Sequence, residues 1–289
     1  MQRRDTALVR HLTSVVLVGC GNMGHAMLRS WLATGTLSAQ NVHVVEPLDA
    51  LLLRASDEGA RTYSTARALP DDLAPNLIVF AVKPQAIDSV VRDYVRFSQR
   101  GSDTTFVSVA AGITLARLEQ ALAPGAPVVR VMPNTPAAIG EGMMVMCPNT
   151  TVSDRQLDGV RTLLKASGVV ATVDDEAQMD AVTAISGSGP AYVFHMIEGL
   201  RAAGAAAGLP EDIAHRLAIQ TVYGAAAYAR QSAEDPAALR EQVTSPNGTT
   251  AAALEVLMRP GGLSALLEEA VRAARDRAAE LGRQSNRHA

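Results

Sequence analysis

The sequence contains very little cysteine, because Cys20 and Cys147 are the only two in 289 residues. Two cysteines cannot build a disulfide scaffold, and such usage is typical of proteins in a reducing compartment. No spacing of cysteine and histidine resembles a zinc site, so we expect no bound metal. These absences predict a cytoplasmic protein that is held together by its apolar core.

Long apolar runs and an excess of positive charge are also missing. No apolar segment approaches the roughly 18–20 residues that a membrane-spanning helix needs, and the first twelve residues lack the apolar core of a signal peptide. The formal net charge is −3, and Arg3-Arg4 is the only basic cluster. We therefore expect neither a membrane nor a nucleic acid as partner, and a short flexible extension over residues 1–12.

Apolar residues are abundant, at 48 % of the chain, which is enough for a sizeable core. In the first half, short β-branched runs alternate with amphipathic or alanine-rich stretches, a pattern typical of a doubly wound parallel sheet in an α/β protein. The runs predict strands at Val15–Val18, Val42–Val45, Leu77–Val82, Thr105–Val109, Val128–Val131, Met143–Met146 and Val169–Val173. The stretches between them predict helices at Met23–Thr34, Leu48–Glu58, Gln85–Tyr94, Leu115–Leu122 and Asp154–Lys165.

The strand pattern stops after about residue 175, and the rest of the chain is typical of helices. The predicted helices are Pro190–Gly208, Pro210–Arg230, Pro236–Gln242, Gly248–Met258 and Leu263–Leu281. Three of them begin near a proline, whose missing N–H is harmless in a first helical turn. We predict two domains, a sheet domain over residues 13–175 and an all-helical domain over residues 176–289, whose extensive apolar helices suggest dimerisation.

The first predicted strand leads directly into Gly19-Cys20-Gly21-Asn22-Met23-Gly24 and then a helix. Gly19 permits a tight turn, Gly21 lets the backbone approach a pyrophosphate, and Gly24 allows helix and strand to pack closely. The G-x-G-x-x-G pattern is weak alone, but between a strand and a helix it predicts a dinucleotide site. The alternative is a turn with a purely structural role.

Glu46 ends the second predicted strand and points to the kind of dinucleotide. An acidic side chain there can accept hydrogen bonds from the adenosine ribose and would repel a 2′-phosphate. The nearest arginine, Arg54, belongs to the next helix and is not expected to adjoin Glu46. We therefore predict a preference for NADH over NADPH. The alternative is that Glu46 only caps the helix that starts near Pro47.

Two further strand ends suit a ligand on such a sheet, since ligands bind at the carboxyl ends of the strands. Lys83, in the segment Ala81–Pro84, could reach a phosphate or ribose, and the alternative is a lysine that is only solvated. The small residues of Ser108–Gly112 allow a ligand to approach the backbone closely.

The helical half contains two loops rich in small and hydroxyl residues. Ser186-Gly187-Ser188-Gly189-Pro190 opens one long helix, and Thr244-Ser245-Pro246-Asn247-Gly248-Thr249-Thr250 precedes another. A helix start exposes free N–H groups at a positive dipole end. The second loop therefore predicts a site for a small anion such as a carboxylate.

Taken together, these segments resemble the pyrroline-5-carboxylate reductase family, in family order and over nearly the full length. The matching segments are Val18–Gly24, Ala81–Pro84, Ala110–Gly112, Met132–Pro136, Asp180–Thr183, Ser186–Tyr192 and Val243–Thr250. The resemblance implies reduction of 1-pyrroline-5-carboxylate to L-proline, the last step of proline synthesis, with NADH or NADPH. It also implies a Rossmann domain, a helical domain that forms homodimers, and dimers that can assemble into decamers.

The resemblance assigns roles to individual residues. Ser245, Gly248 and Thr249 would hold the substrate carboxylate, Thr250 would be the catalytic hydroxyl near the ring nitrogen, and Glu176 would lie near the substrate pocket. The cofactor would contact Gly19, Cys20, Gly21, Asn22, Met23, Gly24, Glu46, Ala81, Val82, Lys83, Pro84, Ala110 and Ala111. Glu46 stands where NADPH-using relatives have a serine.

Three positions depart from the family pattern. Asn247 replaces a usual glycine, and asparagine tolerates left-handed backbone better than most residues. Gln242 replaces a common asparagine, which puts one cofactor contact in doubt. Ala66 replaces an asparagine beside the adenosine, so no contact is expected there.

Two other functions compete with imine reduction. A 3-hydroxyacid dehydrogenase would need a catalytic lysine in the second domain, yet no lysine follows Lys165. The predicted pocket segments also lack a histidine that could protonate an alkoxide, and His195 is expected to be a packed or surface residue of a helix. A non-catalytic dinucleotide sensor would explain the glycine loop but not the two hydroxyl-rich loops.

Overall fold

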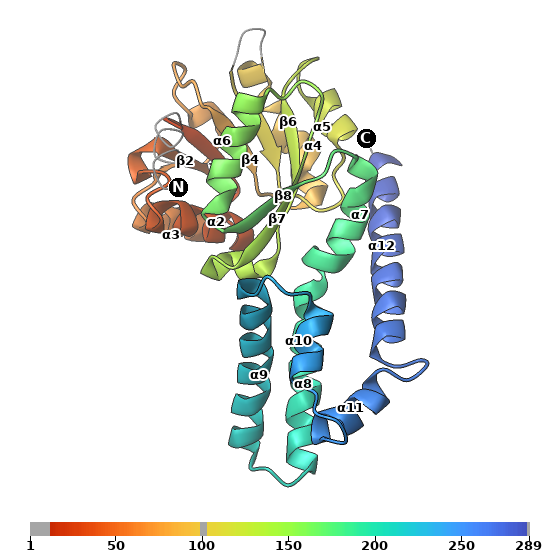
Figure 1. Cartoon of the computed structure of the whole chain (residues 1–289). Coiled ribbons are helices and arrows are strands. Elements are labelled where there is room, and N and C mark those ends of the chain that lie inside the picture. The colour runs from red at the N-terminus through yellow and green to blue at the C-terminus, as the bar shows by residue number, and fades with distance from the viewer. Residues whose placement is uncertain (1–11, 99–102, 288–289) are drawn as a thin grey trace. The chain divides into compact units, whose positions relative to one another are not determined.

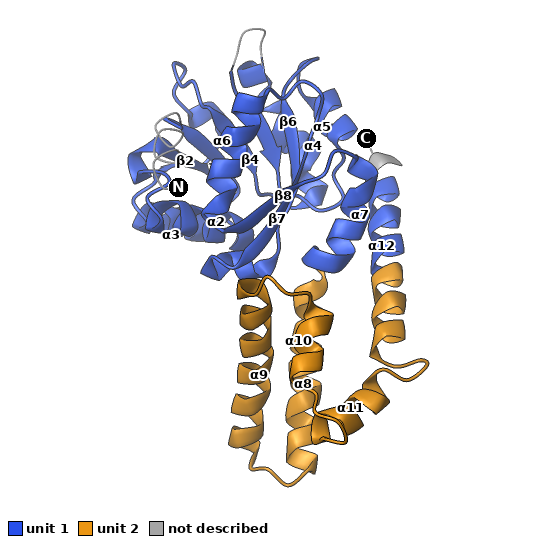
Figure 2. Cartoon of the chain, in the orientation of Figure 1, with its two compact units in different colours: residues 1–187, 274–289 blue, residues 188–273 orange. Residues whose placement is uncertain are grey.

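The computed structural model describes residues 12–98 and 103–287, so all of the predicted extension except Leu12 lies outside the described residues. The chain forms two compact units, residues 1–187 with 274–289 and residues 188–273 (Figures 1 and 2). The long helix α12, Leu263–Arg287, is divided between them. No helix in the described ranges has the length and apolar character that crossing a membrane requires.

The first unit is built on a sheet whose strands follow the order β3-β2-β1-β4-β5-β6-β7-β8. The strands are β1 Val15–Val18, β2 Val42–Val45, β3 Arg61–Tyr63, β4 Leu77–Phe80, β5 Thr105–Ser108, β6 Val128–Met132, β7 Gly142–Pro148 and β8 Gly168–Thr172. The chain starts in the middle, winds outward to β3 and then returns past β1 to β4. This order confirms a doubly wound sheet and brings the carboxyl ends of β1, β4 and β5 to one edge.

Two features of the sheet were not predicted. β6 and β7 pair antiparallel, because the segment between them is too short for the crossover that a parallel pair requires. The strand β3 pairs with the edge of β2. Its residues Arg61 and Thr62 are partly or largely exposed, so it carries no apolar run that could have revealed it.

Helices cover both faces of the sheet, as the alternation in the sequence predicts. They are α2 Asn22–Ala33, α3 Asp49–Asp57, α4 Ile87–Arg92, α5 Leu115–Ala121 and α6 Asp154–Lys165. Along β1, Val15 and Leu17 join a core with the apolar faces of α2 and α6, including the fully buried Trp31. Val16 and Val18 point into a second core with residues of α4 and α5. Alternate side chains of the strand therefore pack into the two cores on opposite faces of the sheet.

The second unit contains α8 Gly189–Ala206, α9 Glu211–Gln231, α10 Pro236–Gln242 and α11 Thr249–Leu257, together with the first part of α12. A Cβ atom built on Gly204 would lie 3.2 Å from Cβ of Ala214. Small residues thus let α8 and α9 approach closely, and Ala214 and Ala218 are buried. The bounds agree closely with the helices predicted from the sequence.

The boundary between the compact units follows Gly187 and not residue 175, where the strand pattern stops. The intervening segment contains α7, Met179–Val182, and a π-helical turn, Thr183–Gly187, neither of which was predicted. Met179 is fully buried in the second core of the sheet unit. Packing against that core assigns the segment to the first unit, and the last part of α12 belongs there as well.

Candidate active site

The glycine loop has the geometry of a close-packed strand–turn–helix connection. Gly19 has φ +89°, and a Cβ atom on it would lie 2.8 Å from the Ala81 carbonyl oxygen. A Cβ atom on Gly24 would overlap the Gly19 carbonyl oxygen, whereas one on Gly21 would meet no atom within 4 Å. Gly19 and Gly24 are therefore required by the fold, while Gly21 leaves an open face beside the start of α2.

Backbone hydrogen bonds align the predicted cofactor segments along one edge of the sheet. The N–H of Gly19 donates to the Val45 carbonyl at 2.9 Å, and the N–H of Ala81 donates to the Val18 carbonyl at 2.8 Å. The N–H of Val109 donates to the Phe80 carbonyl at 3.0 Å. The parallel register thus brings the ends of β1, β2, β4 and β5 together, where a dinucleotide would lie.

Glu46 is buried against the glycine loop. Its Oε2 accepts a hydrogen bond from the Cys20 N–H at 2.8 Å, and its Oε1 accepts one from the Leu48 N–H at 3.0 Å. Only 5 % of the residue is exposed. Because Leu48 immediately precedes α3, Glu46 braces both the loop and the start of that helix, and its contact with a ribose stays a prediction.

Arg54 lies on the next helix, as expected, but it contacts the glycine loop, which was not predicted. From α3 its Nη2 atom donates to the carbonyl oxygens of Cys20 and, at 3.2 Å, Gly21. A guanidinium can reach back this far because its charge lies at the end of a long flexible stem. The loop is thus held by a carboxylate on one of its N–H groups and a guanidinium on its carbonyls.

Cys20 and His25 both carry shifted pKa values beside this loop. Burial raises the pKa of the Cys20 thiol, although the charge of Arg54 opposes the shift. Burial also lowers the pKa of His25, and Arg54 lowers it further, while Glu58 opposes. Both groups are therefore neutral near pH 7, so Cys20 has the character of a packed thiol and not of a nucleophile.

The ends of β4 and β5 contribute to a pocket of about 540 Å³ within the first unit. Pro84 and Ala111, both predicted to contact the cofactor, line it together with Gly112. The segment before Gly187 adds Asp180 and Thr183 to the same wall. The exposed Lys83 is not among the lining residues.

An ion pair between Asp88 and Arg117 forms part of this pocket's wall. The Arg117 Nε atom donates to Asp88 Oδ1 at 2.7 Å, and Nη2 contacts Oδ2. The hydrogen bonds from Arg117 lower the pKa of Asp88, although its partial burial opposes the shift. Both groups are charged at neutral pH, so this ion pair adds no net charge to the wall.

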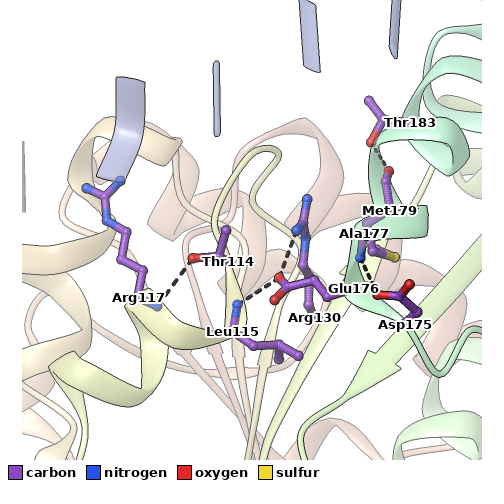
Figure 3. Close-up of polar contacts among 9 residues, drawn as sticks. All are labelled: Thr114, Leu115, Arg117, Arg130, Asp175, Glu176, Ala177, Met179 and Thr183. Carbon is purple, nitrogen blue, oxygen red and sulfur yellow. Dashed lines mark hydrogen bonds and ion pairs between the residues drawn. The ribbon is translucent and has the colours of Figure 1, made fainter. Parts of the chain in front are cut away.

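Glu176 is committed to two donors within the first unit, as Figure 3 shows. Its Oε1 accepts a hydrogen bond from Arg130 Nη1 at 2.8 Å and another from the Leu115 N–H at 2.8 Å. Arg130 is a buried residue of β6, and Leu115 begins α5. The carboxylate thus joins β6, α5 and the segment before α7, and its role near the substrate stays a prediction.

The predicted substrate residues Ser245, Gly248, Thr249 and Thr250 lie in the second unit, on the turn that begins α11. The Gly248 N–H donates to the Ser245 carbonyl at 3.0 Å, and the first helical bond runs from the Ala252 N–H to the Gly248 carbonyl at 3.2 Å. A Cβ atom on Gly248 would overlap the Ser245 hydroxyl. Glycine here leaves room for the Ser245 hydroxyl, and the turn leads into a helix start beside the hydroxyl side chains of Ser245, Thr249 and Thr250.

The structure shows the surroundings of the three residues that depart from the family pattern. Asn247 has φ +58° and is the only residue besides glycine with positive φ in the described part of the chain. The expectation that the turn survives with a left-handed asparagine is therefore confirmed. Gln242 donates to Glu234 from its side-chain amide, and Ala66 is buried in the core.

Comparison with known proteins decides which family has this arrangement. The family model described as pyrroline-5-carboxylate reductase dimerisation matches residues 176–281, and one described as NADP oxidoreductase, coenzyme F420-dependent, matches residues 14–112. The pyrroline-5-carboxylate reductase of Pseudomonas aeruginosa is 40 % identical, covering 93 % of this chain and 97 % of that protein. The chain belongs to the pyrroline-5-carboxylate reductase family.

Solved structures from the pyrroline-5-carboxylate reductase family have the same fold. The Coxiella burnetii reductase superposes with a TM-score of 0.88 at 33 % identity and covers 94 % of this chain and 99 % of its own. The Plasmodium falciparum enzyme, with NADP bound, gives a TM-score of 0.78 at 28 % identity and covers 93 % and 98 %.

Sequence reasoning missed the contacts of Arg54 and Arg130 in this member of the family. Arg54 lies on α3, and its position in the sequence does not show that its side chain contacts the glycine loop. Arg130 sits inside an apolar strand, where a charged residue is unusual enough to predict a buried partner. That signal could have pointed to an ion pair, although not to Glu176 in particular.

Proposed function

We propose that this chain reduces 1-pyrroline-5-carboxylate to L-proline by hydride transfer from NADH or NADPH. The main support for the proposal is that one chain of this family contains two structural features, one suited to a dinucleotide and one suited to a small anion. The first unit holds a dinucleotide-type glycine loop with aligned strand ends, and the second holds a hydroxyl-rich turn at a helix start. Family membership over more than nine tenths of the chain supports the same activity.

The residues of the glycine loop fit a dinucleotide. Gly21 presents an open face, and no side chain fills the space that its Cβ atom would occupy. Next to it, α2 begins without an acidic residue in its first turn or a side-chain cap. The free N–H groups and positive dipole at this helix start suit a pyrophosphate. When bound, the dihydronicotinamide supplies the hydride.

The chain's own residues then have the task of binding and orienting a small imine acid. Ser245, Gly248 and Thr249 would hold its carboxylate at the start of α11, where the helix dipole favours an anion. Thr250 would hydrogen-bond the ring nitrogen, directly or through water. Reduction of a protonated imine gives a neutral amine, so no alkoxide has to be protonated. Orientation of the reacting carbon is therefore the main contribution expected from the protein.

An assay of NADH oxidation separates this activity from its alternatives. Addition of 1-pyrroline-5-carboxylate should start NADH consumption and form proline. A 3-hydroxyacid dehydrogenase would instead reduce NAD⁺ when given a hydroxyacid, and a sensor would bind NADH without consuming it. Consumption of NADH without proline formation would reject the proposed function.

We also propose that NADH is the preferred cofactor. Glu46 places a carboxylate at the end of β2, where the 2′-phosphate of NADPH would be repelled, and Arg54 is already engaged with two loop carbonyls. The substitution Glu46→Gln should raise the NADPH to NADH ratio of kcat/KM by about tenfold, equivalent to about 1.4 kcal/mol. The ratio cancels any general loosening of the loop, since both cofactors use it. A wild-type enzyme that prefers NADPH would contradict the proposal.

We propose in addition that the chain forms a homodimer through its helical unit. Large apolar side chains are exposed on α8 and α9, including Phe194 at 59 %, Leu217 at 52 % and Tyr223 at 66 %. An extended apolar surface of this kind marks an association site. Light scattering should give twice the chain mass or a multiple of it, such as a decamer, and a monomer at micromolar concentration would reject the proposal.

A further inference from the structure

The carboxamide of Asn134 joins three segments of the first unit. Asn134 follows β6 and precedes a 3₁₀ turn, Thr135–Ile139. Its Oδ1 accepts a hydrogen bond from the Met143 N–H at 2.8 Å, and its Nδ2 donates to the Ser186 carbonyl at 3.1 Å. One side chain therefore connects the end of β6, the beginning of β7 and the π-helical turn.

The Ser186 carbonyl has a particular need for a donor from outside its own helix. In a regular helix it would accept from the N–H of the residue four positions later, which here is Pro190. Proline has no N–H, so that bond cannot form. A buried or half-buried carbonyl without a donor is costly, and the Asn134 amide supplies one.

The π-helical turn held in this way contributes to the pocket that two of the predicted cofactor contacts line. Thr183, its first residue, lines the pocket with Pro84 and Ala111. At its other end, Gly187 lies so close to Met132 that a Cβ atom would overlap the methionine methyl group. The last two residues of the turn are thus held against the segment that ends β6, while its first residue faces the pocket. Single π-helical turns occur frequently at functional sites.

We propose that Asn134 is a positioning residue for the imine substrate, acting through the Thr183–Gly187 turn. This inference rests on the proposed reductase activity. Asn134 does not touch the reacting atoms, since both ends of its amide are engaged by the protein. Its donor half keeps the turn at the distance from Pro84 and Ala111 that the substrate requires, and a shift of about 1 Å in such a wall is enough to cost about 10²-fold in kcat/KM.

The substitution Asn134→Asp tests the donor of the side-chain amide apart from its acceptor. The carboxylate keeps an acceptor for the Met143 N–H but replaces the donor to Ser186 with a second oxygen. We expect kcat/KM for 1-pyrroline-5-carboxylate to fall by at least about 10-fold, mainly through a higher KM. The dissociation constant of NADH should stay within about twofold, because the glycine loop is untouched.

A matched control is available at the opposite edge of the sheet. Asn149 also accepts from a strand N–H, that of Val128 at 3.1 Å, and donates to a carbonyl, that of Ala126 at 3.0 Å. Asn149→Asp should lower thermal stability at least as much, because its amide also donates to Glu119. It should leave KM for the imine unchanged.

A second variant moves the turn without altering Asn134. In Gly187→Ala the added methyl group would press on the end of the Met132 side chain. This substitution should raise KM for the imine in the same direction, and it keeps the inference testable if Asn134→Asp does not fold.

The outcomes distinguish this inference from the proposed function. A wild-type protein without turnover would reject the proposed function itself. A wild-type enzyme with proline-forming activity, together with Asn134→Asp or Gly187→Ala variants of unchanged KM, would reject the positioning role alone. Equal changes in the Asn134→Asp and Asn149→Asp variants would show that the effect is general destabilisation, and would also reject it.

Discussion

Replacing Gly24 with alanine should remove most dinucleotide binding and weaken the fold at the same time. A Cβ atom at this position would overlap the Gly19 carbonyl oxygen and lie 3.3 Å from Cβ of Ala81. Neither neighbour can move freely, because Gly19 and Ala81 are hydrogen-bonded to adjacent strands. Overpacking of this kind typically costs about 1–3 kcal/mol. We expect the NADH dissociation constant to rise by at least about 100-fold, or about 2.7 kcal/mol, as measured by fluorescence titration.

Gly21→Ala is the matched variant in the same loop. Nothing lies within 4 Å of the position that its Cβ atom would take, so the melting temperature should remain that of the wild type. The methyl group would nevertheless occupy the space where a pyrophosphate approaches the backbone, and NADH affinity should fall. A Gly21→Ala protein with wild-type affinity would show that the cofactor does not pass over this face. A Gly24→Ala protein with wild-type stability and affinity would contradict the packing argument.

Replacing Thr250 with alanine should lower kcat/KM for 1-pyrroline-5-carboxylate by about 10²-fold, the low end of what a positioned proton-transfer group contributes. Thr250 is the second residue of α11 and is partly buried next to the Gly248 turn. If its hydroxyl contacts the imine nitrogen, the loss should appear mainly in kcat, while NADH binding is preserved. Steady-state kinetics at saturating NADH measures this change.

Two controls test whether the effect belongs to the Thr250 hydroxyl. Thr250→Ser restores a hydroxyl at the same atom and should recover most of the activity. Thr244→Ala removes a hydroxyl from the same turn. That hydroxyl donates to the Arg240 carbonyl of α10 at 2.6 Å. Thr244→Ala should therefore keep kcat/KM within about threefold, the usual range for removal of a single modest hydrogen bond. Wild-type kinetics in Thr250→Ala would remove Thr250 from the mechanism.

Local patterns in the sequence were sufficient to predict most of the elements. β1 and β2 have the predicted bounds, and α6 and α10 also begin and end at the predicted residues. Buried strands of a doubly wound sheet have continuous apolar runs, and helices have start signals such as proline, so both can be recognised from neighbouring residues. β3 and the π-helical turn were not predicted, because each contacts a neighbour far away in the sequence. That neighbour is β2 for β3 and Asn134 for the π-helical turn.

The sequence by itself determined the glycine loop, the hydroxyl-rich turn at the start of α11 and the left-handed Asn247, since each of these depends on residue types within a few positions. Only the tertiary structure decided which partners the charged and amide side chains take. Glu46 and Arg54 both hold the glycine loop, Glu176 pairs with Arg130, and Asn134 supplies the donor that Pro190 lacks. Long polar side chains can reach any of several neighbours, and only the packed chain shows which of them is at hydrogen-bond distance.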